Sequence, residues 1–201
     1  LKKRLILTLY YSDGYFCLSR NFRLQRVGDI NWLLNTYHFA DIAKYIDEIT
    51  IINVTEKIEN DFSKYLDYVE KIMSKVFLPL TLGGGIRKLS DAKILFGFGA
   101  DKIQVNHIIN SKSLVVKDLV DKYGAQSIVA SIDYRRIRDS YKSYFSSGQI
   151  EGFDLKEHLK IAKNCNVGEI ILNSIDQDGT GTGFDLGVTK YSQLYNIPTL
   201  I

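Results

Sequence analysis

Short apolar segments alternate with helical segments along the whole chain, and this alternation restricts the possible folds more than any other feature. Segments predicted as helices carry apolar residues every three or four positions, whereas segments predicted as strands are short apolar runs. The predicted strands are 4–10, 48–53, 79–82, 102–105, 127–133, 169–174 and 197–201. The predicted helices are 32–46, 62–73, 90–98, 113–123, 155–164 and 187–195. The sequence therefore predicts an α/β fold in which helices join parallel strands.

A parallel sheet of this kind is either an open doubly wound sheet or a closed (β/α)8 barrel. An open sheet concentrates its chemistry where the strand order switches, whereas a barrel presents chemistry at the carboxyl ends of all its strands. Polar or glycine-rich residues follow nearly every predicted strand here, which favours the TIM-type barrel. Because such a barrel needs about 250 residues, we expect a single domain, 1–201, that is truncated within strand seven.

Composition and charge exclude several classes of protein. The 201 residues carry a net charge of +3, with Lys and Arg dispersed among Asp and Glu, so no nucleic-acid partner is expected. The sequence has no run of about 18 apolar residues and no pattern of a cleavable secretory signal, so we expect a cytoplasmic protein that does not bind a membrane. Cys17 and Cys165 lack the spacing of metal ligands; we expect reduced thiols, no metal site and no cofactor.

Three consecutive glycines, at positions 83–85, follow the third predicted strand. A glycine-rich turn from strand to helix lets backbone amides approach an anion closely and is typical of phosphate sites. The fourth predicted strand ends just before Asn106 and His107, and the ends of successive strands are neighbours in a barrel. We therefore predict a phosphate site formed by Gly84, Gly85, Asn106 and His107. The alternative is a tight turn that only requires left-handed backbone geometry.

Asp133 ends an apolar run and places a carboxylate at the carboxyl end of the fifth predicted strand. Partial burial there raises the pKa of a carboxyl group toward neutrality, which suits general acid–base catalysis. We therefore predict that Asp133 is catalytic. Two alternatives are that Asp133 caps a loop, or that Arg135 and Arg136 hold it ionised in a salt bridge.

The segment 176–183 is a long loop, rich in glycine and threonine, that follows the sixth predicted strand. Its spacing matches neither a phosphate-binding P-loop nor a calcium-binding EF-hand loop. We interpret this loop, which contains Asp178 and Gly179, as a second phosphate site or a mobile lid. The alternative is a flexible loop without such a function.

Charged residues begin four of the predicted strands, where the bottom of a barrel would lie. They are Arg4, Glu48, Lys102 and Glu169. Two positive and two negative side chains at that end predict a closed ring of ion pairs. Such a ring either stabilises the fold or acts as a gate to the barrel axis.

Several motifs together resemble one enzyme family. They are Lys3-Arg4 with Asp13-Gly14, Gly83-Gly84-Gly85-Ile86, Gly99-Ala100-Asp101-Lys102 with Asn106, Ser131-Ile132-Asp133, and the run from Glu169 to Thr180. In order and spacing they are similar to the cyclase subunit of imidazole glycerol phosphate synthase. The resemblance implies a (β/α)8 barrel that takes ammonia from a glutaminase subunit in a heterodimer and uses it on a phosphorylated substrate in histidine biosynthesis.

The resemblance also implies roles for individual residues. Gly85 and Asn106 match one phosphate site, and Asp178 and Gly179 match the other. Asp133 matches one of the two catalytic aspartates of the family. The charged gate through which ammonia enters the barrel is matched by Arg4, Glu48, Lys102 and Glu169.

The sequence also departs from the family at three positions. Tyr10 stands where the family has its other catalytic aspartate, and a phenol with an ordinary pKa near 10 replaces a carboxylate poorly. Leu18 lies near the place of an expected lysine, and Gln104 replaces a small hydroxyl residue. This combination resembles cyclase-like paralogues that act beside a glutaminase and a sugar amidotransferase to install acetamidino groups on bacterial surface sugars.

Three functions remain open at this point. The first is an ammonia-using synthase subunit, which either makes imidazole glycerol phosphate or passes ammonia to a different phosphorylated or nucleotide-linked acceptor. Tyr10 favours the different acceptor. Another is a non-catalytic ammonia conduit or scaffold, for which Asp133 is dispensable. The last is a sugar-phosphate isomerase of a related barrel family, which does not need the charges at the strand starts.

Overall fold

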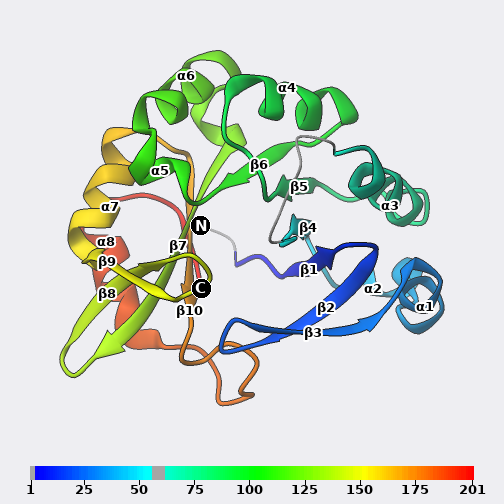
Figure 1. Cartoon of the computed structure of the whole chain (residues 1–201), viewed down its shortest axis with the longest axis horizontal. Coiled ribbons are helices and arrows are strands. Elements are labelled where there is room, and N and C mark those ends of the chain that lie inside the picture. Colours follow the sequence, from blue (N-terminus) through cyan, green and yellow to red (C-terminus); the bar gives the residue numbers. More distant parts are fainter. Residues whose placement is uncertain (1–2, 56–61) are drawn as a thin grey trace. The chain divides into compact units, whose positions relative to one another are not determined.

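The computed structural model describes residues 3–55 and 62–201, which divide into two compact units (Figure 1). Unit 1 comprises the chain up to Leu18 together with Gln25–Ile103, and unit 2 comprises Ser19–Leu24 together with Gln104–Ile201. Each unit contains parallel strands with helices between them. The strand β6 (Lys102–Val105) crosses from unit 1 into unit 2.

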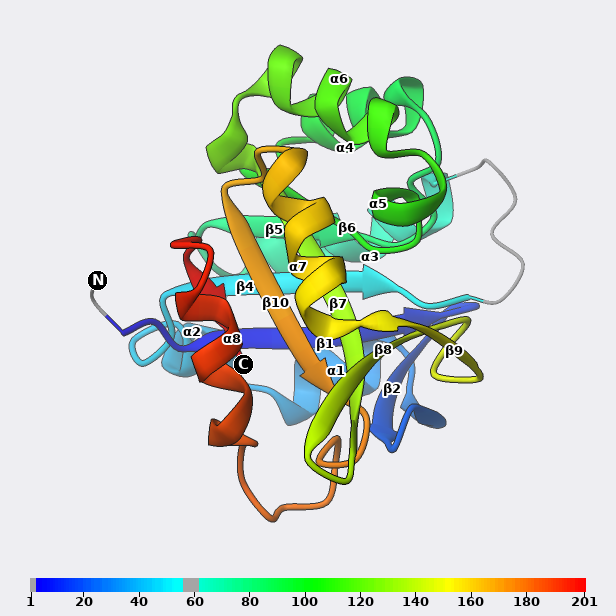
Figure 2. The ribbon, with the colours of Figure 1, turned by 90° about the vertical axis from the view of Figure 1, so that its left-hand side faces the viewer.

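Unit 1 is built on three neighbouring parallel strands and one antiparallel strand (Figure 2). In spatial order they are β5 (Leu80–Gly83), β4 (Glu48–Asn53), β1 (Ile6–Ser12) and β2 (Tyr15–Arg20), and β3 (Arg23–Gly28) follows β2 in the chain. In this register Leu9, Ile51 and Leu82 lie side by side on adjacent strands. All three are buried, so they form the centre of the core of unit 1.

The helices of unit 1 supply the other half of this core. They are α1 (Ile30–Thr36), α2 (Phe39–Ile42), α3 (Ser63–Met73) and α4 (Leu89–Phe98). Val69 and Ile72 of α3 and Leu95 of α4 are fully buried, at the three- and four-residue spacing from which helices were predicted here.

The predicted helix 32–46 is wrong in its length, because the chain leaves the helix at Tyr37. The backbone of Tyr37 is extended, with φ −96° and ψ 109°. The Tyr37 ring stacks on the ring of Phe39 at a centroid distance of 6.0 Å and meets the ring of Trp32 edge-on at 6.2 Å. These aromatic contacts accompany a break into two short helices, α1 and α2.

Unit 2 contains three parallel strands and an antiparallel hairpin extension. In spatial order the parallel strands are β11 (Thr199–Leu200), β10 (Glu169–Ser174) and β7 (Ile128–Ile137); β8 (Ser140–Phe145) pairs with β7, and β9 (Ile150–Asp154) pairs with β8. The predicted strand 127–133 therefore continues for four residues beyond Asp133. The segment 142–148 is part of a hairpin, which the sequence analysis did not predict.

The helices of unit 2 are α5 (Ile108–Ser111), α6 (Ser113–Tyr123), α7 (Leu155–Asn164) and α8 (Thr189–Gln193), with 3-10 turns at Ala125–Ser127 and Leu186–Val188. His158 of α7 is buried, and its Nε2 atom lies 2.8 Å from Nδ2 of Asn110. Burial lowers the pKa of His158 to about 4, so this histidine is neutral at physiological pH.

The prediction of the α/β, TIM-type class is confirmed, because parallel strands alternate with helices through both units. The predicted bounds of β4, β6, β10, α6 and α7 agree with the structure at both ends. In the described part of the chain, no helix has the length and apolar character needed to cross a membrane.

Candidate functional site

Asp133 lies between two asparagine side chains in unit 2. Nδ2 of Asn106, which follows β6, donates a hydrogen bond of 2.9 Å to Oδ2 of Asp133. Nδ2 of Asn173, on the adjacent strand β10, donates a hydrogen bond of 2.9 Å to Oδ1 of Asp133. In the β7–β10 register Asn173 is the direct partner of Asp133. Both carboxylate oxygens therefore accept a hydrogen bond from an amide.

The environment of Asp133 raises the pKa of its carboxyl group to about 6. Burial is the largest cause, and the negative charge of Asp178 adds to it. The hydrogen bonds from Asn173 and Asn106 act in the opposite direction, because they stabilise the ionised form. A carboxyl group with this pKa exchanges a proton near neutral pH, as general acid–base catalysis requires.

The proposed salt bridge between Asp133 and the two arginines that follow it is wrong. Nη1 of Arg135 lies 2.9 Å from Oδ1 of Asp176, and the backbone N–H of Arg136 donates to Oδ2 of the same carboxylate. The side chain of Arg136 donates to the carbonyl oxygen of Arg138. Among the described residues, both arginines are therefore engaged away from Asp133.

Asp178 anchors the 19–24 segment within unit 2. Its Oδ2 atom accepts hydrogen bonds from the hydroxyl of Ser19 at 2.5 Å and the backbone N–H of Phe22 at 2.9 Å. The side chain of Asn21 donates to the carbonyl oxygen of Ile175. Gly179 packs so closely on this segment that a Cβ atom would lie 2.0 Å from the carbonyl oxygen of Ser19. The loop after β10 is thus held by specific contacts, while its phosphate role stays a prediction.

The glycine turn after β5, Gly83-Gly84-Gly85, adopts left-handed backbone geometry at two of its residues. The φ angles of Gly84 and Gly85 are 90° and 73°. A Cβ atom on Gly84 would lie 1.9 Å from the carbonyl oxygen of Asn53, at the end of β4. The prediction of a turn that requires glycine is confirmed. Binding of phosphate by Gly84, Gly85, Asn106 and the exposed His107 stays a prediction.

A cluster of charges, here called the strand-start cluster, surrounds Glu48 in unit 1. Oε2 of Glu48 accepts from Nζ of Lys102 at 2.8 Å and from Nη1 of Arg4 at 3.3 Å. Oε1 accepts from the hydroxyl of Thr81 at 2.5 Å. Three of the four predicted gate residues therefore meet, and Thr81 is a member that the sequence analysis missed. Glu169, the fourth, is the buried first residue of β10 in unit 2.

Tyr10 lies within β1, where it pairs with Ile52 of β4 and Cys17 of β2. Its side chain is half-buried. The neighbouring carboxylate, Asp13, lies in the turn after β1 with φ 50°, and one of its oxygens contacts Arg26 at 3.4 Å on the surface. Asp13 therefore follows the strand, whereas Tyr10, the predicted replacement of an aspartate, lies within it.

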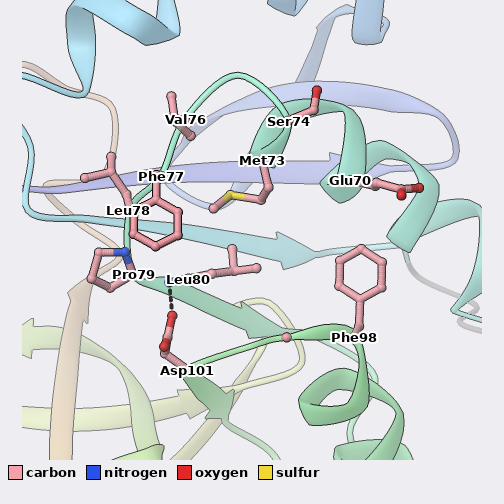
Figure 3. A pocket seen from close by; sticks show the side chains of 11 residues that line it. Glu70, Met73, Ser74, Val76, Phe77, Leu78, Pro79, Leu80, Phe98 and Asp101 are labelled. Carbon is pink, nitrogen blue, oxygen red and sulfur yellow. Dashed lines mark hydrogen bonds between the residues drawn. The ribbon is translucent and has the colours of Figure 1, made fainter.

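An apolar groove of about 700 Å3 lies beside the start of β5 in unit 1 (Figure 3). It runs from the end of α3, where Met73 lies, to the end of α4, where Phe98 lies, and its floor includes Leu80. The side chain of Phe77 on its wall is fully exposed. This groove was not predicted from the sequence, because its lining residues come from two separate segments of the chain, 70–80 and 98–101.

The contact of Asn173 with Asp133 was not predicted from the sequence. Along a strand every second side chain lies on the same face, so Asn173 of β10 shares a face with Ile171, beside Ser131 and Asp133 of β7. Polar residues at paired positions of two adjacent strands were the available signal. In the described chain no cluster of three or more His, Cys, Asp or Glu side chains has the arrangement of a metal site.

Comparisons with known proteins agree with these features. The profile of the family described as "Histidine biosynthesis protein" matches residues 32–201. Over 92% of its length the chain is 42% identical to a protein of Parasynechococcus marenigrum, provisionally named imidazole glycerol phosphate synthase subunit hisF2, of which it covers 69%. Over its whole length it is 36% identical to imidazole glycerol phosphate synthase subunit HisF of Streptococcus mutans, of which it covers 79%. The chain therefore belongs to the family of the cyclase subunit, HisF, of imidazole glycerol phosphate synthase.

Proposed function

We propose that this protein is the synthase subunit of a cytoplasmic glutamine amidotransferase, in which a glutaminase partner supplies ammonia for a reaction on a phosphorylated or nucleotide-linked acceptor. Asp133 is the general acid–base group of this reaction. The predicted phosphate sites, at Gly84, Gly85, Asn106 and His107 and at Asp178 and Gly179, hold the anionic acceptor.

The observation that carries this proposal is the environment of Asp133. A buried carboxyl group that has no cationic partner among the described residues, is held by two amides and has its pKa raised to about 6 shows the protonation behaviour of a catalytic group. The contribution of such a group to rate is typically 10²–10⁴-fold. Burial without a catalytic role would leave this carboxyl group a source of instability at neutral pH.

The amino-terminal side of unit 1 supports a partner that delivers ammonia. The strand-start cluster lies there, with Glu48 at the first position of β4. Leu5, Tyr45 and Phe77 are exposed apolar residues that each precede a strand, β1, β4 or β5, by one to three positions. Exposed apolar side chains near a groove are typical of a protein interface, so we place the glutaminase of a heterodimer on this side.

Tyr10 supports an acceptor other than the histidine precursor. The cyclase reaction of the family uses a pair of aspartates, and this chain supplies only Asp133 of that pair. An acetamidino-forming paralogue that passes ammonia to a bacterial surface sugar fits this change. A second candidate, an ammonia conduit whose partner performs the chemistry, is favoured by the same replacement.

Replacing Glu48 by Gln is expected to weaken the coupling to a glutaminase. Arg4 and Lys102 then lose their shared carboxylate, and the two cations repel each other at the ammonia entrance. We expect the wild-type protein to stimulate glutamate release by the glutaminase subunit of an imidazole glycerol phosphate synthase, and Glu48→Gln to lower this stimulation about tenfold. An enzymatic glutamate assay measures it, with the exposed Glu157→Gln as the matched control. Stimulation that is unchanged in Glu48→Gln would contradict the role given to the strand-start cluster, and a wild-type protein that does not stimulate the glutaminase would favour the isomerase alternative.

The wild-type protein is not expected to restore growth without histidine to a bacterial strain that lacks its HisF gene. A phenol, whose ordinary pKa is near 10, replaces the missing aspartate poorly. The HisF subunit of Streptococcus mutans, expressed in the same strain, is the positive control. Growth supported by the wild-type protein would contradict the assignment to another acceptor, and growth supported only by Tyr10→Asp would identify this residue as the difference.

A further inference from the structure

The amide of Asn173 has no freedom to rotate without breaking a hydrogen bond. Its Nδ2 atom donates to Oδ1 of Asp133 at 2.9 Å and to the hydroxyl oxygen of Ser131 at 2.9 Å. An amide nitrogen carries two hydrogens, so both are used. Ser131 is buried on β7, two residues before Asp133. Its hydroxyl oxygen accepts the second hydrogen of the Asn173 amide and so holds this side chain in place.

Asn106 contacts the other oxygen of the Asp133 carboxylate, Oδ2. Because Asn106 follows β6 and Asn173 lies on β10, the two donors come from different segments of the chain, and each contacts a different oxygen of Asp133. Two hydrogen bonds to the two oxygens of one carboxylate restrict rotation about its terminal bond. Here we call this arrangement the amide clamp.

We infer that Asn173 and Asn106 are positioning residues that hold the Asp133 carboxylate in one orientation and keep its ionised form accessible near neutral pH. The inference rests on the proposed function, in which Asp133 transfers the proton. Without the clamp, burial alone would hold Asp133 protonated over a wider pH range, and a protonated carboxyl group cannot act as a base. Ser131 acts one step further away, because it contacts only the amide.

Titration of the Asp133 carboxyl group tests the clamp without any substrate. Protein labelled with 13C at the aspartate carboxyl carbons is titrated by NMR, and the Asp133 signal is assigned from its loss in Asp133→Asn. We expect a pKa of about 6 in the wild type. Asn173→Leu, which keeps the size but removes the donor, and Asn106→Ala are each expected to raise this pKa by about one unit. The exposed Asn164→Ala is the control that leaves it unchanged.

Ser131→Ala separates the contribution of Ser131 to the pKa of Asp133 from that of Asn173. It frees one hydrogen of Asn173 but leaves the bond to Asp133, so a shift smaller than that of Asn173→Leu is expected. A pKa that stays within 0.3 units of the wild-type value in both Asn173→Leu and Asn106→Ala would overturn the inference. If Asn173→Leu does not fold, Asn173→Ala removes the same donor with a smaller side chain.

The outcome separates the clamp from the proposed function. Loss of the clamp should move the pH dependence of turnover upward together with the pKa of Asp133. Full turnover by Asp133→Asn, with the pKa shifts of the asparagine variants intact, would defeat the catalytic assignment alone. Unshifted pKa values with an inactive Asp133→Asn would defeat the clamp alone.

Discussion

Asp133→Asn is expected to lower the rate of the acceptor reaction by about 10²–10⁴-fold, while the folded protein becomes more stable at pH 7. The loss of rate follows from the loss of the proton-transfer group, because an amide does not titrate. The gain in stability follows from the burial of Asp133, since the substitution removes a buried charge that has no cationic partner within residues 3–55 and 62–201.

The sign of the stability effect follows from the direction of the pKa shift. The pKa of Asp133 rises from 3.8 to about 6 on folding, so the folded state binds the proton more tightly than the unfolded state does. The stability that this proton contributes is fully present below pH 3.8 and is lost as the pH rises through 6. At pH 7 the loss amounts to about 3 kcal/mol. Asparagine at position 133 avoids this loss but places an N–H group against a neighbouring amide. We therefore expect the free energy of unfolding to rise by about 1–2 kcal/mol.

Urea unfolding at pH 4 and at pH 7 measures this effect. The difference in free energy of unfolding between Asp133→Asn and the wild type should grow as the pH rises. His158, whose pKa is lowered to about 4, titrates in an overlapping range, but it is present in both proteins and cancels in the difference. The matched control is Asp139→Asn, which removes an exposed carboxylate in the turn after β7.

Two results would contradict this prediction. A stability difference that does not depend on pH would show that the carboxyl group titrates normally. Unchanged activity of the complex, with partner binding intact, would support the conduit as the function of this protein.

Gly84→Ala is expected to lower the free energy of unfolding by about 2–4 kcal/mol. The φ angle of Gly84 is 90°, a backbone conformation that alanine adopts only with strain. In addition, the new Cβ atom would lie 1.9 Å from the carbonyl oxygen of Asn53. That oxygen belongs to the backbone at the end of β4, so the glycine turn or the strand must shift to make room.

Gly97→Ala in α4 provides the matched control. A Cβ atom at Gly97 meets nothing within 4 Å, and alanine favours the helix over glycine by up to about 1 kcal/mol. Gly97→Ala should therefore be neutral or stabilising in the same urea titration. Equal stability of Gly84→Ala and the wild type would show that the turn has room for a side chain. In that case the close approach of the Gly84 and Asn53 backbones could not explain why position 84 is a glycine.

Local residue patterns were sufficient for the regular βα units. The strand 48–53 carries three isoleucines among its six residues, and α7 shows an apolar face at the spacing of a helix. The hairpin formed by β8 and β9 was missed because its short strands mix polar and aromatic residues without a regular alternation. Tyr141 and Ser143 are buried there only because the strand pairs with β7.

The candidate site divides in the same way. The sequence alone determined that the glycine turn follows a strand and that Asp133 ends a buried apolar run, because both are read from local patterns of apolar residues. It also determined the family, which depends on residue identity, and it predicts that Tyr10 replaces a catalytic aspartate of that family. Only the tertiary structure decided the partners: Arg135 pairs with Asp176, Thr81 joins Glu48, and Asn173 holds Asp133. Hydrogen bonds and burial depend on atoms that are brought together from distant parts of the chain, and no local pattern encodes those distances.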